Sequence, residues 1–498
     1  MTLCGSQWRI FLLVFVLLFN LSCKISSDGG NADKSLNSAG TSSGAQAANT
    51  SNQDTRSGET SSDSQVSPAD SAADNSSNSA DTGVSEHPAD DSNQDTGAPP
   101  DGDMPEQQEC TRYVSVSGNN SNSGLTEETA WLTLQKAADA APQGSVICVA
   151  GGTYRERVVV KKSNLTFQGQ PRLAPIADGG FEVRASDTQI RGFKITTSVI
   201  SDWPARYPVF IRADRASVMD NYFYDVKGDS AIQGNWNEYP RNVWIAFNRI
   251  YNCAAGINVQ GDNWLVEYNE VERLHDYGYS DADYSRFHGD NHIFRHNNFH
   301  GTTSADIGGS HVDCFQTFDG GDWATHTHNI LIENNVCSGF HQGIMSEAVH
   351  NQATDTITVR NNVFANFESS FIQNSHGIIV HDIPYYTIVH NTFVNIGVRG
   401  VLIKRAEYGN AKYEVVKNNI FYNVDGIAYS FWDGSQTSQG GYNIVYKSYN
   451  PDPKWPTDLI GLDPQFVDAD QRDFHVQQGS PACDRGENGS YIGAYPCQ

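Results

Sequence analysis

The densest run of polar side chains on a strand-like pattern is SHVDCFQTFDGGDW, at residues 310–323. His311 and Asp313 lie two residues apart in it, and side chains two apart on a strand share a face. An imidazole beside a carboxylate can transfer a proton or hold a metal ion, so we predict a catalytic role for this pair. Gln316 and Trp323 are candidate ligand contacts in the same run. The competing interpretation is a solvated His–Asp pair at the start of a strand.

Three later segments align with this run if each forms the equivalent strand in a successive repeat. They are GIMSE (343–347), SFIQN (370–374) and GVLIK (400–404), set against DCFQTF (313–318). The alignment pairs His311 with His341 and Asp313 with Gly343. It also predicts a column of outward side chains formed by Thr317, Glu347, Asn374 and Lys404.

A separate polar run, SDADYSRFHGDNH at residues 280–292, carries three carboxylates. Carboxylate oxygens are the ligands that Ca²⁺ prefers, so Asp281, Asp283 and Asp290 form a candidate calcium site. Their spacing does not match an EF-hand loop, and a polar loop without an ion is the competing interpretation.

The elements that position these residues follow from an internal repeat. Between residues 200 and 445, a short apolar strand ends in Asn and a second apolar strand follows at once. Strands without a helical period at this repeat length predict an all-β chain, a single-stranded right-handed parallel β-helix in which stacked coils form one core. An Asn at the same turn of each coil can form a ladder of side-chain amides. The predicted ladder residues are Asn221, Asn248, Asn269, Asn297, Asn334, Asn361, Asn391 and Asn418.

The two ends of this region carry a family resemblance. YVSVSGNNSNSG (113–124) with AWLTLQKAADAAPQGSVICVAGGTYRERVVV (130–160), and DPQFVDADQRDFHVQQGSPACDRG (463–486) with YIGAYP (491–496), resemble secreted β-helix proteins of the pectate-lyase-like superfamily. The resemblance spans 110–498 and implies a groove that binds sugar chains. Residues 131–141 form an amphipathic pattern, which predicts a short N-terminal capping helix over the first coil.

On this fold, the function we predict is a polysaccharide lyase that cleaves a uronic-acid-containing glycan by β-elimination. Such an enzyme neutralises the sugar carboxylate, removes the adjacent proton and protonates the leaving oxygen. We assign Lys404 as the base, His311 with Asp313 as the proton relay or ligand pair, and Glu347 to the same groove. Lys404 lies two coils from Glu347, which is about 10 Å by stacking. The assigned substrate contacts are Arg405, His341, Trp323, Gln316 and Asn374.

Other functions remain open on this fold. Asp313 and Glu347 lie about 14 Å apart in the alignment, at ~3.3 Å per residue. Carboxylates that hydrolyse a glycosidic bond need about 5 to 9.5 Å, so this pair does not favour a hydrolase. The alternatives are a glycoside hydrolase or epimerase using other residues, or a non-catalytic carbohydrate-binding or adhesin-like solenoid. In that last case Lys404 and Arg405 are a solvated strand end.

The N-terminal residues predict export and a tether. Arg9 precedes the apolar stretch from Ile10 to Phe19, which is typical of a secretory signal, and the signal resembles that of a bacterial lipoprotein with Cys23 lipidated. Residues 24–109 hold 16 acidic and 3 basic side chains and almost no large apolar ones, so we predict a disordered linker. The domains are therefore residues 1–23, 24–109 and 110–498. We expect a surface-attached monomer whose only membrane contact is the lipid anchor.

Charge and cysteines narrow the class further. The chain carries a formal charge of −25, and a nucleic-acid partner is not expected because no part offers a net positive field. No Cys/His pattern matches a structural zinc site. In an oxidising compartment we expect disulfides Cys110–Cys148 and Cys483–Cys497, with Cys314–Cys337 a weaker candidate and Cys253 unpaired. Ca²⁺ is the one cofactor that the sequence suggests.

Overall fold

The computed structural model of the chain describes residue 104 and residues 106–497, except 199–205, 279–280, 320–325, 349–353, 405–410, 433–437 and 453. These residues belong to one compact unit, Asp90–Gln498. No helix among them is long and apolar enough to cross a membrane. The predicted signal with Cys23, and the predicted linker up to residue 103, lie outside the described residues, as do Arg405 and Trp323.

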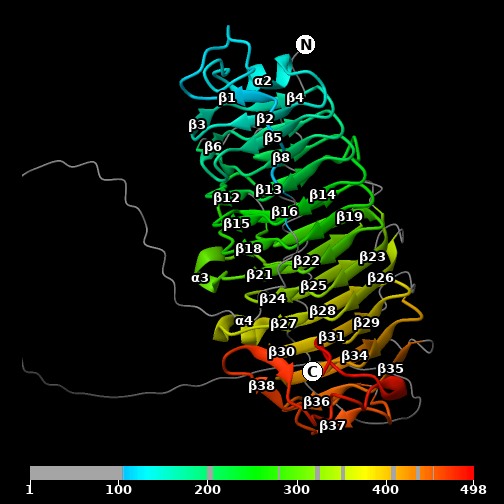
Figure 1. The fold of residues 1–498 in the computed structure, drawn as a ribbon. Coiled ribbons are helices and arrows are strands. Elements are labelled where there is room, and N and C mark those ends of the chain that lie inside the picture. Colours follow the sequence, from blue (N-terminus) through cyan, green and yellow to red (C-terminus); the bar gives the residue numbers. More distant parts are fainter. Residues whose placement is uncertain are drawn as a thin grey trace, which may run out of the picture. The chain divides into compact units, whose positions relative to one another are not determined.

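The described chain winds through three faces of parallel strands, here named A, B and C, which stack from β1 to β37 (Figure 1). Face A consists of β1 (Arg112–Val114), β2 (Val146–Val149), β5 (Thr166–Gly169), β8 (Gln189–Arg191), β11 (Ser217–Met219), β14 (Trp244–Ala246), β17 (Leu265–Glu267), β20 (Ile293–Arg295), β23 (Thr327–Glu333), β26 (Thr354–Arg360), β29 (Thr387–Val389), β32 (Val415–Lys417) and β35 (Gln439–Gly441). Face B consists of β3 (Gly152–Arg155), β6 (Pro175–Asp178), β9 (Lys194–Thr196), β12 (Tyr222–Tyr224), β15 (Arg249–Tyr251), β18 (Glu270–Glu272), β21 (Asn298–His300), β24 (Val336–Cys337), β27 (Val363–Ala365), β30 (Thr392–Ile396), β33 (Ile420–Val424), β36 (Ile444–Tyr446) and β37 (Leu459–Ile460). Face C consists of β4 (Val158–Val160), β7 (Phe181–Val183), β10 (Val209–Ile211), β13 (Ser230–Gly234), β16 (Ala255–Gln260), β19 (Ser285–Asp290), β22 (Asp313–Phe318), β25 (Gln342–Glu347), β28 (His376–His381), β31 (Arg399–Lys404) and β34 (Ile427–Trp432).

Each full coil runs from face A to B to C and back to A, which is the predicted right-handed parallel β-helix. Side chains from equal positions of successive coils stack inside it. The rings of Phe364, Phe393 and Phe421 follow one another at centroid distances of 5.5 and 5.0 Å. A coil cannot bury its apolar side chains alone, so the core forms only by stacking.

An amide ladder occupies the corner between faces A and B, as predicted. Asn335, for example, donates its main-chain N–H and its Nδ2 to Oδ1 of Asn362, at 2.9 and 3.0 Å. Its own Oδ1 accepts the same two donors from Asn297, both at 2.9 Å. The ladder ends where Asp458 accepts from Asn443. Its members are Asn221, Asn248, Asn269, Asn297, Asn335, Asn362, Asn391, Asn419 and Asn443.

Three predicted ladder positions were wrong by one residue. At these three corners two Asn residues are adjacent, and the prediction chose the first where the structure uses the second. Asn334, Asn361 and Asn418 instead have φ of 55°, 58° and 57°. Each turns the chain in the left-handed region, which Asn tolerates better than most residues, so that the following Asn points into the ladder.

The capping helix is α2 (Leu134–Ala140), shorter than predicted because Thr133 caps it and accepts the N–H of Lys136 at 3.1 Å. Leu134, Ala137 and Ala138 are buried. The carboxylate of Glu156 accepts the free N–H groups of the first turn from Leu134 and Gln135, at 2.8 and 3.0 Å. The helix therefore covers the first coil with its polar ends satisfied.

The C-terminal segment packs on the outer side of face B. Its hairpin, β38 (Phe466–Asp468) with β39 (Asp473–Val476), and the 3₁₀ turn Glu487–Gly489 follow the last coil. Phe466 and Phe474 pack with side chains of face B such as Val394 and Ile420 in a second apolar cluster. The main-chain N–H of Ala494 donates to Oγ1 of Thr392 at 3.0 Å. Face B is thus covered in its C-terminal part.

The three expected disulfides, Cys110–Cys148, Cys314–Cys337 and Cys483–Cys497, are present, and Cys253 is buried and unpaired. Burial raises the pKa of the Cys253 thiol to about 12. Disulfides are typical of proteins outside the reducing cytoplasm, so the fold indicates an extracytoplasmic location.

Candidate functional site

The predicted site residues lie on face C, and the strand register decides which of them meet. Phe318, Glu347, His381, Lys404 and Trp432 occupy equivalent positions in five successive strands. Neighbouring strands lie about 4.8 Å apart, so Glu347 and Lys404 are about 10 Å apart across two coils, as predicted. We call Glu347, His381 and Lys404 the acid–base row.

Two members of the predicted column were wrong. Thr317 is fully buried and lies opposite Ser346, and its hydroxyl shares a 2.9 Å hydrogen bond with Thr327. Asn374 ends the helix α4 (Ser369–Asn374), so SFIQN is not a strand at all. The strand of that coil is β28, and its last residue, His381, takes the place assigned to Asn374.

A pattern in the sequence could have revealed His381. QGIMSE (342–347), HGIIVH (376–381) and RGVLIK (399–404) each have Gly second, two aliphatic or Met side chains after it, and a polar side chain sixth. The Gly is required because a Cβ at Gly343, Gly377 or Gly400 would lie 2.5 Å or less from a main-chain oxygen of the next coil. Matching this template would have rejected SFIQN.

The acid–base row is linked by one ion pair. Nδ1 of His381 lies 3.6 Å from Oε1 of Glu347, and both side chains are about one-fifth exposed. Lys404 comes next in the row, and no described carboxylate pairs with it. A carboxylate, an imidazole and an ammonium therefore follow one another on the outer surface.

Arg399 begins β31, and its guanidinium extends along the face toward the row. The guanidinium carbon lies 4.8 Å from the ring centroid of Trp432, which is 39% exposed. Burial lowers the pKa of Arg399, and none of the described carboxylates forms an ion pair with it. An arginine and an exposed indole together offer a surface for an anionic ring.

A second cluster lies at the beginning of the face C strands. Nδ1 of His311 lies 3.1 Å from Oδ1 of Asp313, which is fully buried, and Nε2 of Gln316 donates to the other carboxylate oxygen at 2.9 Å. Burial alone would lower the pKa of His311, but Asp313 outweighs it and raises the pKa to about 9. His311 is therefore a cation at neutral pH.

His341 stacks on His311, as the alignment predicted, with ring centroids 5.0 Å apart. Its Nδ1 accepts the N–H of Val312 at 3.3 Å, and burial together with the charge on His311 lowers its pKa to about 4. His341 is a neutral base at neutral pH. The residue opposite Asp313 is Gln342, not the predicted Gly343.

The two clusters are too far apart to act on one sugar. Glu347 lies five residues along the face from Gln342, which is opposite Asp313, so the separation is about 16 Å at ~3.3 Å per residue. Lys404 lies two coils further. The structure therefore does not bring the predicted relay of His311 and Asp313 to Lys404, because both the length of the strand and three coil spacings separate them.

The predicted calcium ligands also separate. Asp283 precedes β19 and Asp290 ends it, so they are about 23 Å apart along an extended chain. Asp283 bonds Arg286 and accepts the N–H of Asp313 at 3.1 Å. Asp281 lies 3.7 Å from the same guanidinium, and these groups line a cavity of about 10 Å³, room for one water. Asp281 and Asp283 neutralise a buried arginine, and burial raises the pKa of Asp283 to about 7.

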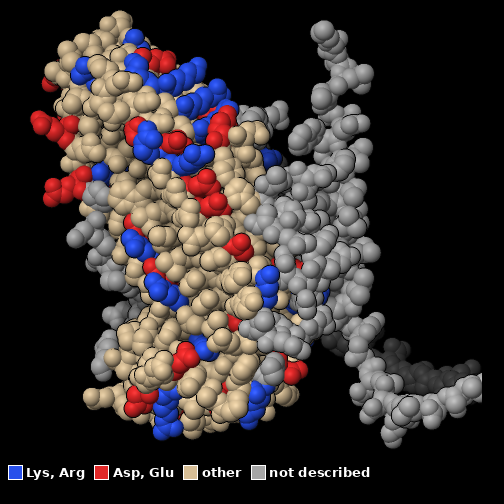
Figure 2. All heavy atoms as spheres, turned by 90° about the vertical axis from the view of Figure 1, so that its right-hand side faces the viewer, with Lys and Arg blue, Asp and Glu red and all other residues tan. Residues whose placement is uncertain are grey.

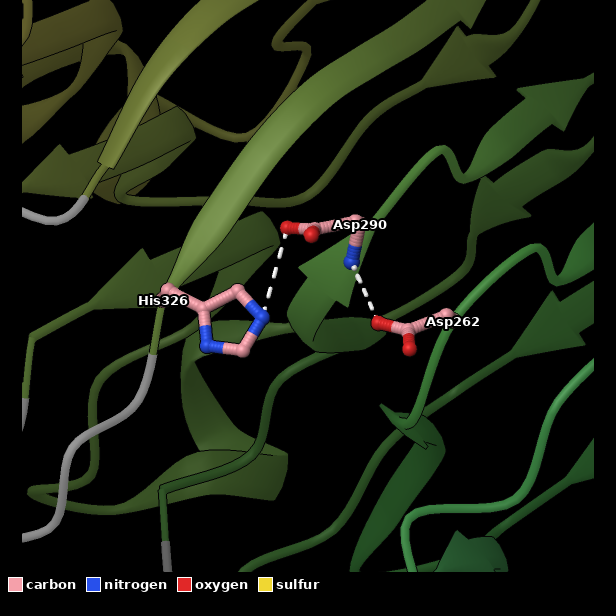
Figure 3. A group of neighbouring side chains, drawn as sticks. All are labelled: Asp262, Asp290 and His326. Carbon is pink, nitrogen blue, oxygen red and sulfur yellow. Dashed lines mark hydrogen bonds and ion pairs between the residues drawn. The ribbon is translucent and has the colours of Figure 1, made fainter.

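Asp290 has other neighbours. Asp262 and His326, from the coils on either side, each offer a ligand atom within 4.8 Å of it and of one another. Figure 3 shows the His326 ring directed at the Asp290 carboxylate. Residue spacing does not reveal this group, because its members are 28 and 36 residues apart.

Comparison with known proteins gives a partial family match. The model of the family described as periplasmic copper-binding protein (NosD) matches residues 319–450. This segment contains the acid–base row and His326. No curated protein matches the chain.

Solved structures are similar at the level of overall architecture. A complex of XylC with xylose has a TM-score of 0.45 at 11% identity, covering 72% of this chain and 87% of that one. The pectate lyase Pel9A has a TM-score of 0.44 at 14% identity, covering 79% and 97%. The A-module of the mannuronan C-5 epimerase AlgE6 of Azotobacter vinelandii has a TM-score of 0.43 at 14% identity, covering 66% and 92%.

Proposed function

We propose that the chain is a polysaccharide lyase that cleaves a uronic-acid-containing glycan by β-elimination on face C. The observation that carries the proposal is a pair of cations, Arg399 and Lys404, without carboxylate partners in the described chain of a protein with net charge −25. They lie beside an exposed indole and an imidazole–carboxylate pair. A polyanionic sugar chain needs such a local cationic surface.

Each group has a part in the reaction. Arg399 neutralises the sugar carboxylate while the ring stacks on Trp432, and Lys404, once it has given up its own proton to solvent, removes the proton beside that carboxylate. The electron pair forms a carbon–carbon double bond as the glycosidic carbon–oxygen bond breaks. His381, held by Glu347, supplies the proton to the leaving oxygen. This assignment keeps Lys404 and Glu347 from the sequence analysis and replaces His311 and Asp313 by His381.

Carboxylate spacing supports elimination over hydrolysis. The separation of about 16 Å between Asp313 and Glu347 exceeds the range of about 5 to 9.5 Å that glycosidases use. The proposed chemistry needs no second carboxylate and assigns no step to Ca²⁺. Assays with added Ca²⁺ and with a chelator test whether the ion is needed to hold the substrate.

Activity on a panel of polymers tests this function. Full-length protein with pectate, alginate or a glycosaminoglycan should generate the ultraviolet absorbance of an unsaturated uronate. Lys404→Ala should lower kcat about 100-fold or more, because it removes the base. The exposed Lys412, on the segment before β32, gives the matched control Lys412→Ala, which should keep full activity.

Three results would contradict the proposal. New reducing ends without absorbance would identify a hydrolase, and altered sugar configuration without cleavage would identify an epimerase. Binding without any product would identify an adhesin-like solenoid. Full activity in Lys404→Ala would remove Lys404 as the base.

We also propose that the protein is a surface-attached lipoprotein, with Cys23 as the lipidated residue and residues 24–109 as the spacer. The extracytoplasmic disulfides and the order of Arg9, the apolar stretch and Cys23 support this proposal. The spacer would allow the enzyme to reach an insoluble polymer while the protein stays on the cell.

A further inference from the structure

Asp262, Asp290 and His326 occupy the corner between faces C and A in three successive coils. Asp262 follows β16, Asp290 ends β19 and His326 precedes β23. The main-chain N–H of Asp290 donates to Oδ1 of Asp262 at 3.1 Å, and the N–H of Gly289 donates to the carbonyl of His326 at 2.7 Å. Coil stacking therefore holds one side chain of each coil at a common point, as Figure 3 shows.

The three side chains have the spacing of a ligand set. Their ligand atoms all lie within 4.8 Å of one another, and Nε2 of His326 is 3.4 Å from Oδ1 of Asp290. Ligands about 2.1 Å from a tetrahedral ion lie about 3.4 Å apart, so small rotations of Asp262 would complete the geometry.

Two buried polar atoms beside this point have no hydrogen-bond partner. They are Oδ1 of Asp290 and the hydroxyl of Tyr239, whose ring packs 5.7 Å from that of His326. Neither oxygen forms a hydrogen bond, although Oδ1 of Asp290 lies 3.4 Å from Nε2 of His326, and a cation held between the two carboxylates would stabilise this carboxylate oxygen.

The balance of charged side chains around this point also favours a bound cation. Asp262 has one arginine beside it, Arg241, which lies 3.6 Å from its Oδ2, and the ion-pair neighbour of Asp290 is His326. The neighbouring Asp355 is already bonded to His328. A divalent ion between Asp262, Asp290 and His326 would offset the remaining charge.

We propose that Asp262, Asp290 and His326 bind one divalent first-row transition ion of the Zn²⁺ type. Imidazole nitrogen together with carboxylate oxygen suits such ions, whereas Ca²⁺ takes oxygen ligands alone. Three protein ligands leave a position open to water or to an anionic ligand, and the side chains of Asp290 and His326 are 30% and 41% exposed. The ion would also clamp three coils at this corner.

Titration of purified, chelator-treated full-length protein with Zn²⁺ alone, without saccharide, tests the site by calorimetry. We expect one ion per chain, and a tenfold or greater loss of affinity in Asp290→Asn and in His326→Ala. Asp214→Asn is the matched control. Asp214 accepts the main-chain N–H of Arg241 at 2.8 Å, just as Asp262 accepts the main-chain N–H of Asp290. Asp214 is not one of the three proposed metal ligands.

Thermal unfolding gives a second readout. Zn²⁺ should raise the Tm of the wild type and of Asp214→Asn but not that of Asp290→Asn, since an ion that binds only the folded state stabilises it. Circular dichroism checks that each variant is folded. The proposal would be overturned if Zn²⁺ showed no saturable binding, or if His326→Ala bound Zn²⁺ as tightly as the wild type. It would also be overturned if Ca²⁺ bound as tightly as Zn²⁺ and did so in His326→Ala as well. The site shares no residue with the acid–base row, so its failure leaves the proposed lyase activity untouched.

Discussion

Two stacked histidines on face C have opposite protonation states at neutral pH. His311 is held as a cation by Asp313, with Asp283 and Asp281 adding negative charge nearby, and its pKa is raised to about 9. Burial and the charge of its neighbours keep His341 and His376 neutral, with pKa values of about 4. At the residue scale, an imidazole on this face is therefore charged at neutral pH where a buried carboxylate lies beside it.

The His311–Asp313 pair predicts a stability change in alkali. A group whose folded pKa is raised contributes stability that is complete below its unfolded pKa, near 6.5, and is lost as the pH rises through about 9. With His311 36% exposed, screening by solvent reduces the contribution to about 1 to 2 kcal/mol. Urea unfolding from pH 6.5 to 9.5 should show that loss in the wild type and not in His311→Gln.

The difference in unfolding free energy between the wild type and His311→Gln removes the contribution of titrating groups that both proteins contain. Parallel stability curves for wild type and His311→Gln over this pH range would show that the ion pair contributes nothing. Asp313→Asn provides an independent check, since it removes the partner and should flatten the curve in the same way.

At the scale of elements, each corner between faces A and B combines a left-handed residue with a ladder Asn. The two roles need different properties. The first needs a residue that tolerates positive φ, and the second needs both a donor and an acceptor on a short side chain. Adjacent Asn residues satisfy both, which is why the type of residue alone did not separate Asn334 from Asn335.

Alanine at these two positions should give different losses of stability. Asn335→Ala leaves the main-chain N–H of Asn297 and one of its two Nδ2 N–H groups buried without an acceptor, which we expect to cost about 3 to 4 kcal/mol. Asn334→Ala should cost only about 1 to 2 kcal/mol for its φ of 55°, and Asn334→Gly should cost less. Urea unfolding midpoints measure the three changes. A larger loss in Asn334→Ala than in Asn335→Ala would contradict the assigned ladder.

At the scale of the whole solenoid, the segments that cover it lie at its first coil and on face B. Helix α2 covers the first coil, and the C-terminal segment covers part of face B. Basic and acidic side chains also pair across coils, as in Arg215 with Asp187, and Figure 2 shows this mixing over the upper part of the face that it draws. Arg399 and Lys404, without described carboxylate partners, therefore remain for an anionic ligand.

The proposed attachment predicts where the whole protein is found. Expressed with its own signal in a bacterial host, the wild type should sediment with membranes and incorporate labelled fatty acid. Cys23→Ser should be unlabelled and soluble, because the acyl chains that hold the protein are absent. Cys4→Ser is the matched control and should behave as the wild type. Equal labelling of wild type and Cys23→Ser would contradict lipidation at this residue.

Much of the fold could be predicted because it depends on local patterns that repeat. The spacing of the Asn turns indicated a stack of parallel coils, and the apolar face of residues 131–141 indicated the cap. The register within face C was harder, because the breaks between strands differ in length. Shifting SFIQN into a strand replaced His381 by Asn374, while Glu347 and Lys404, which end well-formed strands, were placed correctly relative to each other.

The sequence by itself therefore determined the solenoid, its disulfides, and the two-coil spacing of Glu347 and Lys404. Repetition makes these features local, since each depends on one coil and its neighbour. Only the tertiary structure separated His311 and Asp313 from Lys404, placed His381 in the acid–base row, and joined Asp262, Asp290 and His326. These contacts and separations depend on the position of each side chain along its strand and on the path of each loop to the next coil. The spacing of residues in the sequence gives neither of these.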